Sequence, residues 1–183
     1  WLTYSGNLTG QRYSLLDLHD AIGKGMTVRP IANMVNHETN ELFFENLEIP
    51  AENLIGKEGM GFKTAMRVLD KARLNIAAVC VGVAERMLQD ALRYAMERRQ
   101  FGRELIEFQA VQTAIADMIV DVDAARLLVY RAAVGAGTGV PDPLEASIAK
   151  CFSNAMAKRV SDMAIQLHGG YGYHPDYHVE RHH

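Results

Sequence analysis

Two arginines, an aromatic ring and a glycine follow one another in the segment Glu97–Gly102, which reads ERRQFG. Apolar residues recur at a helical spacing before it, so the segment is predicted to lie at the end of a helix that Gly102 stops. Guanidinium groups offer a rigid fork of donors that fits phosphate oxygens, and a phenyl ring offers a face for stacking. Cations also favour helix C-termini through the helix dipole alone. The residues therefore indicate either a site for a phosphate-bearing planar ligand or a simple capped helix end.

Two further segments carry groups that could bind a ligand. The segment Gln166–Tyr173 (QLHGGYGY) places two glycines after a predicted helix, where a glycine normally acts as a C-cap. Glycines also let another group approach the backbone closely, and Gln166 offers an amide to a nucleobase edge. The segment Leu69–Arg73 (LDKAR) places charges on an otherwise apolar helix. These charges mark either a solvated helix face or a binding site.

The composition restricts the class of protein. Apolar residues make up 49% of the 183 residues and charged residues 22%, which is typical of a folded globular chain. A net charge of -3 provides no basic field for a nucleic acid, and no apolar run is long enough for membrane insertion. Cys80 and Cys151 lie in apolar helical patterns, so both are predicted to be small core residues of a reducing compartment. Together with the resemblance described below, this makes the bacterial cytoplasm or the mitochondrial matrix the expected compartment.

The elements that would position these groups change character along the chain. The first part is strand-like, and its predicted strands are 13–18, 26–31 and 41–50. Three strands are too few for an independent sheet. From Gly56 the pattern is helical, with long helices predicted from Phe62 onward, from 108 to 135 and from 144 to 167. The predicted fold is mainly α: an antiparallel helical bundle with three of four helices, preceded by a partial β-domain.

Taken in order, these segments resemble the acyl-CoA dehydrogenase family over residues 20–183. The matching landmarks are Thr27–Pro30, His37–Phe44, Ile49–Gly56, Gly61–Lys63, Asp70–Arg73, Glu97–Gly102, Phe108–Gln109, Gln166–Gly172 and Tyr177–Arg181. The resemblance implies that residues 1–55 are part of a middle β-domain. It also implies that residues 56–183 are a C-terminal helical bundle, truncated at its end.

The resemblance further implies a flavoprotein whose FAD is shared between subunits. In the family, the Arg-Phe-Gly corner and the Gln-x-x-Gly-Gly turn hold the adenosine-pyrophosphate part of the FAD of the neighbouring subunit. The matching residues here are Arg98, Gln100, Phe101, Gln109, Gln166, Gly169 and Gly170. Trp1 and Thr3 resemble the family's Trp-Ile-Thr segment, so Trp1 would pack on the flavin and Thr3 would hydrogen-bond it. A homodimer, or a homotetramer built as a dimer of dimers, is therefore expected.

The substrate contacts of the family fall on the first bundle helix, where Asp70 and Arg73 match positions that line the acyl-CoA site. Phe62, Met66 and Leu69 lie near the same helix face and are predicted to be core residues. The family places its catalytic carboxylate either in a Glu-Gly-Thr motif after the last landmark or just before the matching arginine. Ala72 occupies the second position. The base is therefore expected beyond His183, and the chain as given is expected to lack activity.

The implied reaction is the α,β-dehydrogenation of an acyl-CoA thioester in fatty acid β-oxidation. A carboxylate removes the α-proton, the β-hydrogen passes to FAD as hydride, and the electrons leave to an electron-transfer flavoprotein. Two alternatives remain open at this point. One is an acyl-CoA oxidase or nitroalkane oxidase on the same fold, and the other is a catalytically inactive helical assembly fragment.

Overall fold

The computed structural model describes residues 21–32, 40–54 and 56–182. The predicted strand at 13–18 and the flavin candidates Trp1 and Thr3 lie outside these residues. The chain divides into two compact units, residues 1–61 and residues 62–183, and each unit is described by itself.

The described part of the first unit is an antiparallel strand pair. Strand β1 (Met26–Pro30) pairs with strand β2 (Asn40–Phe44), with Met26 opposite Phe44 and Pro30 opposite Asn40. Gly25 before β1 must be glycine, because its φ is +107° and a Cβ would lie 2.7 Å from the backbone oxygen of Glu45. The strand predicted over 41–50 ends at Phe44, because Asn46 turns the chain with a left-handed φ of 51°.

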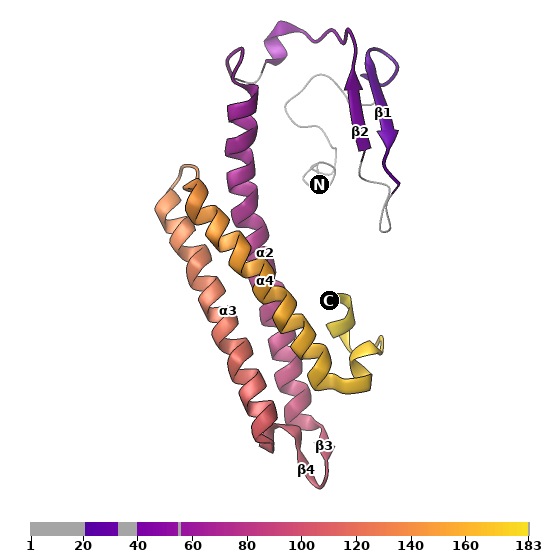
Figure 1. Ribbon diagram of the computed structural model, residues 1–183, viewed down its shortest axis with the longest axis vertical. Coiled ribbons are helices and arrows are strands. Elements are labelled where there is room, and N and C mark those ends of the chain that lie inside the picture. Colours follow the sequence, from indigo (N-terminus) through magenta and orange to yellow (C-terminus); the bar gives the residue numbers. More distant parts are fainter. Residues whose placement is uncertain (1–20, 33–39, 55, 183) are drawn as a thin grey trace. The chain divides into compact units, whose positions relative to one another are not determined.

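The second unit contains three long helices, as the apolar periodicity predicts. They are α2 (Gly61–Glu97), α3 (Gln109–Ala136) and α4 (Pro143–His168). Figure 1 shows them running antiparallel in sequence order, with α4 crossing over α2. Asp142 is the N-cap of α4, and its carboxylate accepts hydrogen bonds from the backbone N–H groups of Leu144 (3.0 Å) and Glu145 (3.1 Å). The mainly helical class predicted from the sequence is confirmed.

Small residues dominate the core of the bundle. Its buried members are Ala77, Val81, Ala84, Met87, Ala91, Met118, Val122, Ala125, Val129, Ala132, Ala149, Met156, Val160, Ala164 and Val179. Alanines on α3 and α4 let these two helices approach closely, and the three methionines fill the remaining space. Val179 comes from the segment after α4, so the C-terminal residues are part of the same core.

Three predicted core residues lie at the surface of the chain. Cys151 on α4 is an exposed free thiol. Phe62 and Leu69 are also exposed, because the first turns of α2 extend past the loop that joins α3 and α4 (Figure 1). Periodicity identifies an apolar helix position, but it does not say whether a neighbouring element covers that position.

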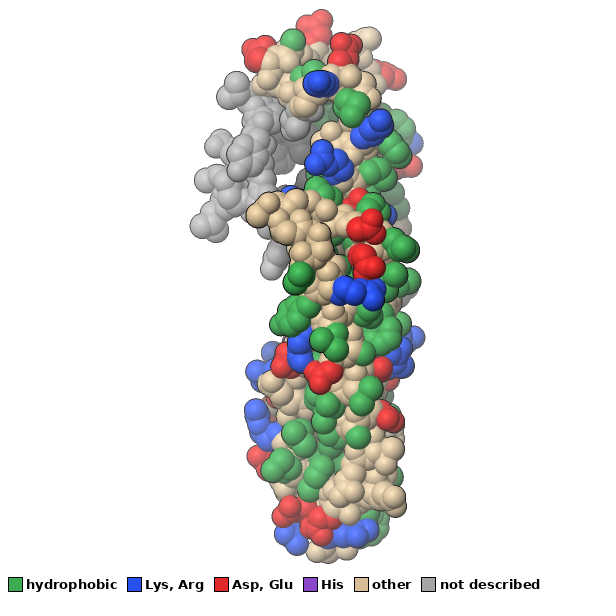
Figure 2. All heavy atoms as spheres, turned by 90° about the vertical axis from the view of Figure 1, so that its left-hand side faces the viewer, with side chains coloured by type: hydrophobic (Ala, Val, Ile, Leu, Met, Phe, Trp, Pro, Cys, Tyr) green, Lys and Arg blue, Asp and Glu red, His purple; other side chains and the backbone are tan. Residues whose placement is uncertain are grey.

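Helix α3 also carries an outward apolar row. Val120, Leu127 and Val134 are exposed and recur every seven residues, and Tyr130 lies beside them. Figure 2 looks onto this side of the bundle and shows apolar side chains at the surface among charged ones. A spacing of seven residues is typical of a helix seam that contacts another helix. Among the described residues, no helix has the length and hydropathy needed to cross a bilayer.

Candidate functional site

The arginine-rich segment forms a small β-hairpin. Helix α2 ends at Glu97, and the strands β3 (Arg99–Gln100) and β4 (Arg103–Glu104) pair across a two-residue turn. Both turn residues have a left-handed backbone, with φ of 53° at Phe101 and 83° at Gly102. Tight hairpins of this kind need a positive φ at both central positions. The prediction that Gly102 stops the helix was therefore wrong, since this glycine turns the hairpin instead.

Local polar contacts hold the hairpin in place. The Arg99 guanidinium lies 3.3 Å from the Glu104 carboxylate and also donates to the carbonyl of Gly102 at 3.2 Å. The Glu104 N–H donates to the Glu107 carboxylate at 3.1 Å, which caps the short helix η2 (Leu105–Glu107). The backbone of Leu105 donates to the carbonyl of Arg98 at 2.9 Å. Arg99 is thus used within the hairpin, and Arg98 is the arginine left for another role.

The glycine-rich turn after α4 forms the second part of the site. Gly169 caps α4 with a φ of +57°, and its N–H donates to the carbonyl of Gln166. Gly172 must be glycine because a Cβ would lie 2.9 Å from the backbone oxygen of Ile165. Neither the backbone conformation nor a close contact requires a glycine at position 170, since the φ of Gly170 is not left-handed and a Cβ would meet no atom within 4 Å. Its missing side chain leaves open space beside the backbone.

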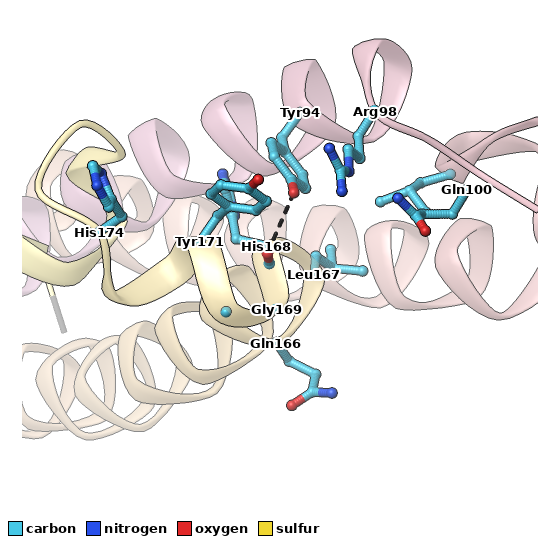
Figure 3. Close-up of a pocket in the computed structure, with 11 residues that line it drawn as sticks. Tyr94, Arg98, Gln100, Gln166, Leu167, His168, Gly169, Tyr171 and His174 are labelled. Atoms are coloured by element: carbon cyan, nitrogen blue, oxygen red, sulfur yellow. Dashed lines mark hydrogen bonds between the residues drawn. The ribbon is translucent and has the colours of Figure 1, made fainter.

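The hairpin and the glycine turn line an open pocket of about 510 Å³. Its lining residues are Tyr94, Arg98, Gln100, Leu105, Gln166, Leu167, His168, Gly169, Gly170, Tyr171 and His174. Figure 3 shows Arg98 and Gln100 entering from the end of α2 and the hairpin, opposite the turn that follows Gln166. Five residues assigned from the sequence therefore meet here, although about seventy residues separate the two segments.

The pocket suits an anionic, planar ligand. Its described lining contains one arginine and two histidines and no carboxylate. The Arg98 guanidinium lies over the ring of Tyr171 at 5.2 Å, and among the described residues no carboxylate pairs with it. A guanidinium without a carboxylate partner can bind phosphate oxygens with two parallel hydrogen bonds. Tyr171 offers an exposed ring face at the same place.

Beneath the pocket lies an aromatic cluster of Tyr94, His168 and Tyr177. The Tyr94 and His168 rings stack at 4.3 Å, and Tyr177 meets both rings edge-on at 5.5 and 5.7 Å. The Tyr94 hydroxyl donates to the carbonyl of His168 at 3.4 Å, and burial raises the pKa of this hydroxyl. The hydroxyl therefore stays a donor at neutral pH. His168 Nδ1 lies 2.7 Å from the carbonyl of Ala164.

The remaining FAD candidates of the described chain lie outside the pocket. Phe101 occupies the tip of the hairpin with its side chain 94% exposed, and its ring centroid is 6.4 Å from that of Phe108. Gln109 is the first residue of α3 and is also exposed. The structure thus divides the predicted cofactor residues of the described chain between the pocket, the hairpin tip and the first residue of α3.

The two predicted substrate residues lie elsewhere on α2. Asp70 is buried, with 7% of its surface exposed, and its carboxylate pairs with the guanidinium of Arg73. This cluster is therefore not a plain solvated face. About 36 Å of helix separate Arg73 from Glu97, at 1.5 Å per residue. Within one chain, the pair therefore lies far from the pocket.

Sequence reasoning missed several residues of the pocket. Tyr94, His168, Tyr171 and His174 line it, yet none was singled out. Tyr94 precedes Arg98 by one helical turn, and His168 and Tyr171 flank the glycine pair directly. A search of the positions one turn before the arginine and beside the glycines would have found three of them.

Comparison with known proteins gives the chain a family. The family pattern "Acyl-CoA dehydrogenase, C-terminal domain" matches residues 59–183. The chain belongs to the acyl-CoA dehydrogenase family. Among curated members of this family, the short-chain specific acyl-CoA dehydrogenase of Megasphaera elsdenii is 46% identical over 145 residues, which are 79% of this chain and 38% of that protein. The chain thus spans about 40% of the length of such relatives.

Other relatives extend the comparison. The CarC subunit of the caffeyl-CoA reductase-Etf complex of Acetobacterium woodii is 40% identical over 148 residues, covering 81% of this chain and 39% of that protein. The solved butyryl-CoA dehydrogenase of Megasphaera elsdenii superimposes with a TM-score of 0.77 at 42% identity, covering 86% of this chain and 42% of that one. The structure of PigA with FAD and proline gives a TM-score of 0.76 at 28% identity, with the same coverage.

Proposed function

We propose that this chain is part of an FAD-dependent acyl-CoA dehydrogenase that oxidises acyl-CoA thioesters between the α and β carbons. The observation that carries the proposal is the pocket at the end of α2 and α4. It brings together Arg98, Gln100, Gln166, Gly169 and Gly170, five of the seven residues to which the family resemblance assigns the adenosine-pyrophosphate part of FAD. The match to the C-terminal domain of acyl-CoA dehydrogenases over residues 59–183 includes all five of them.

The side chains of the pocket fit this part of FAD. Arg98 supplies an unpaired guanidinium for the pyrophosphate, and no carboxylate among the described lining residues repels it. Gln100 and Gln166 supply amide groups for polar edges. Gly170 leaves the open space that a Cβ would fill. A bound FAD would supply the hydride acceptor of the reaction.

The hairpin tip supports a contact with a second molecule. Phe101 holds a left-handed φ of 53°, which a side-chain-bearing residue adopts at a cost, while its ring is 94% exposed. The fold of this chain gains little from an aromatic ring there. An exposed aromatic residue on a firmly held turn is well placed to bury its ring against a bound cofactor or a neighbouring subunit.

The position of Asp70 and Arg73 supports a shared active site. These residues lie some 36 Å along α2 from the pocket, further than one FAD molecule can bridge. In the proposed homodimer, one subunit provides the acyl-CoA residues and its neighbour provides the pocket. The exposed seven-residue row on α3 supports further association into a homotetramer. The buried Asp70 holds the Arg73 guanidinium in a fixed orientation beside the proposed acyl-CoA site.

The proton-abstracting base is proposed to be a carboxylate that follows His183 in the complete protein. Ala72 carries only a methyl group at the alternative family position. We also propose an electron-transfer flavoprotein as the electron acceptor, because the related CarC is a subunit of an Etf complex. The relatives compared above with a named organism are bacterial, which supports a bacterial cytoplasm as the compartment.

The test is the FAD content of the full-length protein that contains this chain. In the variant Arg98→Ala, we expect FAD affinity to fall about 10- to 100-fold, because the pyrophosphate loses its charged partner. The preference among acyl chain lengths should not change. Flavin absorbance after gel filtration measures the content, and flavin fluorescence gives the Kd.

Arg103→Ala is the matched control. Arg103 lies on the same hairpin, but its guanidinium stacks on Phe108 at 3.9 Å and does not line the pocket. This variant should retain its FAD. The proposal fails if Arg98→Ala keeps the wild-type flavin content, or if both variants lose FAD equally.

A further inference from the structure

Two chain segments must be held at a fixed separation for the proposed pocket to work. Arg98 lies just past the end of α2, and the Gly169–Gly170 turn follows the end of α4. Among the described residues, no hydrogen bond or ion pair joins the Arg98 side chain directly to that turn. Its contact there is the ring of Tyr171, at 5.2 Å. Some other contact must therefore set the distance between the arginine and the glycines.

Tyr94 lies where such a contact is needed. The Arg98 N–H donates to the carbonyl of Tyr94 at 2.9 Å, so the helical geometry of α2 continues to Arg98. Residues four apart in this geometry share one helix face. The position of the Tyr94 ring is thereby coupled to that of the Arg98 side chain.

On the other side, the Tyr94 ring contacts the residue next to the glycines. His168 stacks on it at 4.3 Å with an interplanar angle of 25°, and His168 directly precedes Gly169. The Tyr94 hydroxyl donates to the carbonyl of His168 at 3.4 Å, a carbonyl at the C-terminal end of α4. Both side chains are at least nine-tenths buried, at 9% and 4% exposure. The stack is therefore a rigid contact between the two segments.

We propose that Tyr94 is a positioning residue of the nucleotide site, and that its stack on His168 sets the distance between the Arg98 guanidinium and the Gly169–Gly170 turn. This inference rests on the proposed function of the pocket. Tyr94 acts through Arg98 and need not touch the ligand. The stack contributes more than the hydrogen bond, because the 3.4 Å separation is long for an O–H donor.

The experiment measures the Kd for FAD of the full-length holoprotein by flavin fluorescence. Tyr94→Phe keeps the ring and should change the Kd less than about threefold. Tyr94→Leu removes the stack and should weaken binding about tenfold. In an Arg98→Ala background, Tyr94→Leu should cause no further loss, because the group that it positions is gone. If Tyr94→Leu fails to fold, His168→Leu is the second variant. It removes the other ring of the stack and should also weaken FAD binding about tenfold.

Val122→Ala is the control for a general loss of stability. Val122 is buried in the core on α3 and does not line the pocket. This variant should lower the melting temperature and leave the Kd unchanged.

The inference is overturned if Tyr94→Leu and His168→Leu both bind FAD as the wild type does. It is equally overturned if the Tyr94→Leu loss persists in full without Arg98, or if Val122→Ala weakens binding as much. Unchanged binding in Arg98→Ala alone would instead overturn the proposed function, and this inference with it.

Discussion

The two ends of helix α2 differ in what surrounds them. From Ala77 to Ala91, its buried residues recur every three or four positions and pack against α3 and α4. From Gly61 to Ile76, the one buried residue is Asp70, while large apolar side chains such as Phe62 are exposed. One continuous helix thus serves as a core element at one end and carries an uncovered apolar face at the other. The comparison shows that helix propensity and burial are decided separately.

The largest expected difference between the two ends concerns stability. Met87→Ala removes a fully buried side chain from the core and should reduce the free energy of unfolding by about 2–5 kcal/mol. Phe62→Ala removes a larger side chain that is 75% exposed and should cost less than about 0.5 kcal/mol. Urea unfolding of this chain measures both values. Equal losses would show that the start of α2 is covered in solution.

A functional difference of intermediate size is expected from the charged pairs of the two ends. Asp70→Asn leaves Arg73 without its anionic partner, and the KM for acyl-CoA should rise about tenfold in the full-length enzyme. Asp90→Asn breaks a comparable pair with Arg86, 2.8 Å apart, near the other end of the helix. That variant should keep the wild-type KM, and both should keep their FAD. Steady-state kinetics and flavin absorbance check this, and an unchanged KM in Asp70→Asn would refute the substrate role.

The smallest effect is a difference in thiol reactivity that reports where α4 covers α2. Burial raises the pKa of the Cys80 thiol, which the nearby Lys150 only partly opposes. The thiol also donates to the Asn154 side chain of α4 at 3.2 Å. A raised pKa lowers the fraction of reactive thiolate at any given pH, so iodoacetamide should modify Cys80 slowly at neutral pH and faster as the pH rises. The exposed Cys151 should react first. Mass spectrometry of timed samples measures both rates, and equal rates would contradict the packing.

The helices were predictable because their signals are local. The apolar spacing of Ala77, Val81 and Ala84 and the break between Ala136 and Pro143 mark helix faces and ends without reference to the rest of the chain. The end of α2 was not predictable in the same way. Gly102 suits a helix cap and a hairpin turn equally well, since both need a left-handed residue. Pairing between β3 and β4 decides in favour of the hairpin.

The sequence by itself determined the helical class, the family resemblance and five of the residues that line the pocket. Arg98, Gln166 and the glycine pair carry their chemistry in residue type and spacing, which are local properties. Only the tertiary structure decided that Arg98 faces Gly170 across a pocket and that Tyr94 and His168 join the two sides. It also shows that Asp70 and Arg73 lie far along α2 from this pocket. Contacts between segments about seventy residues apart depend on how the helices pack, and no short pattern encodes that packing.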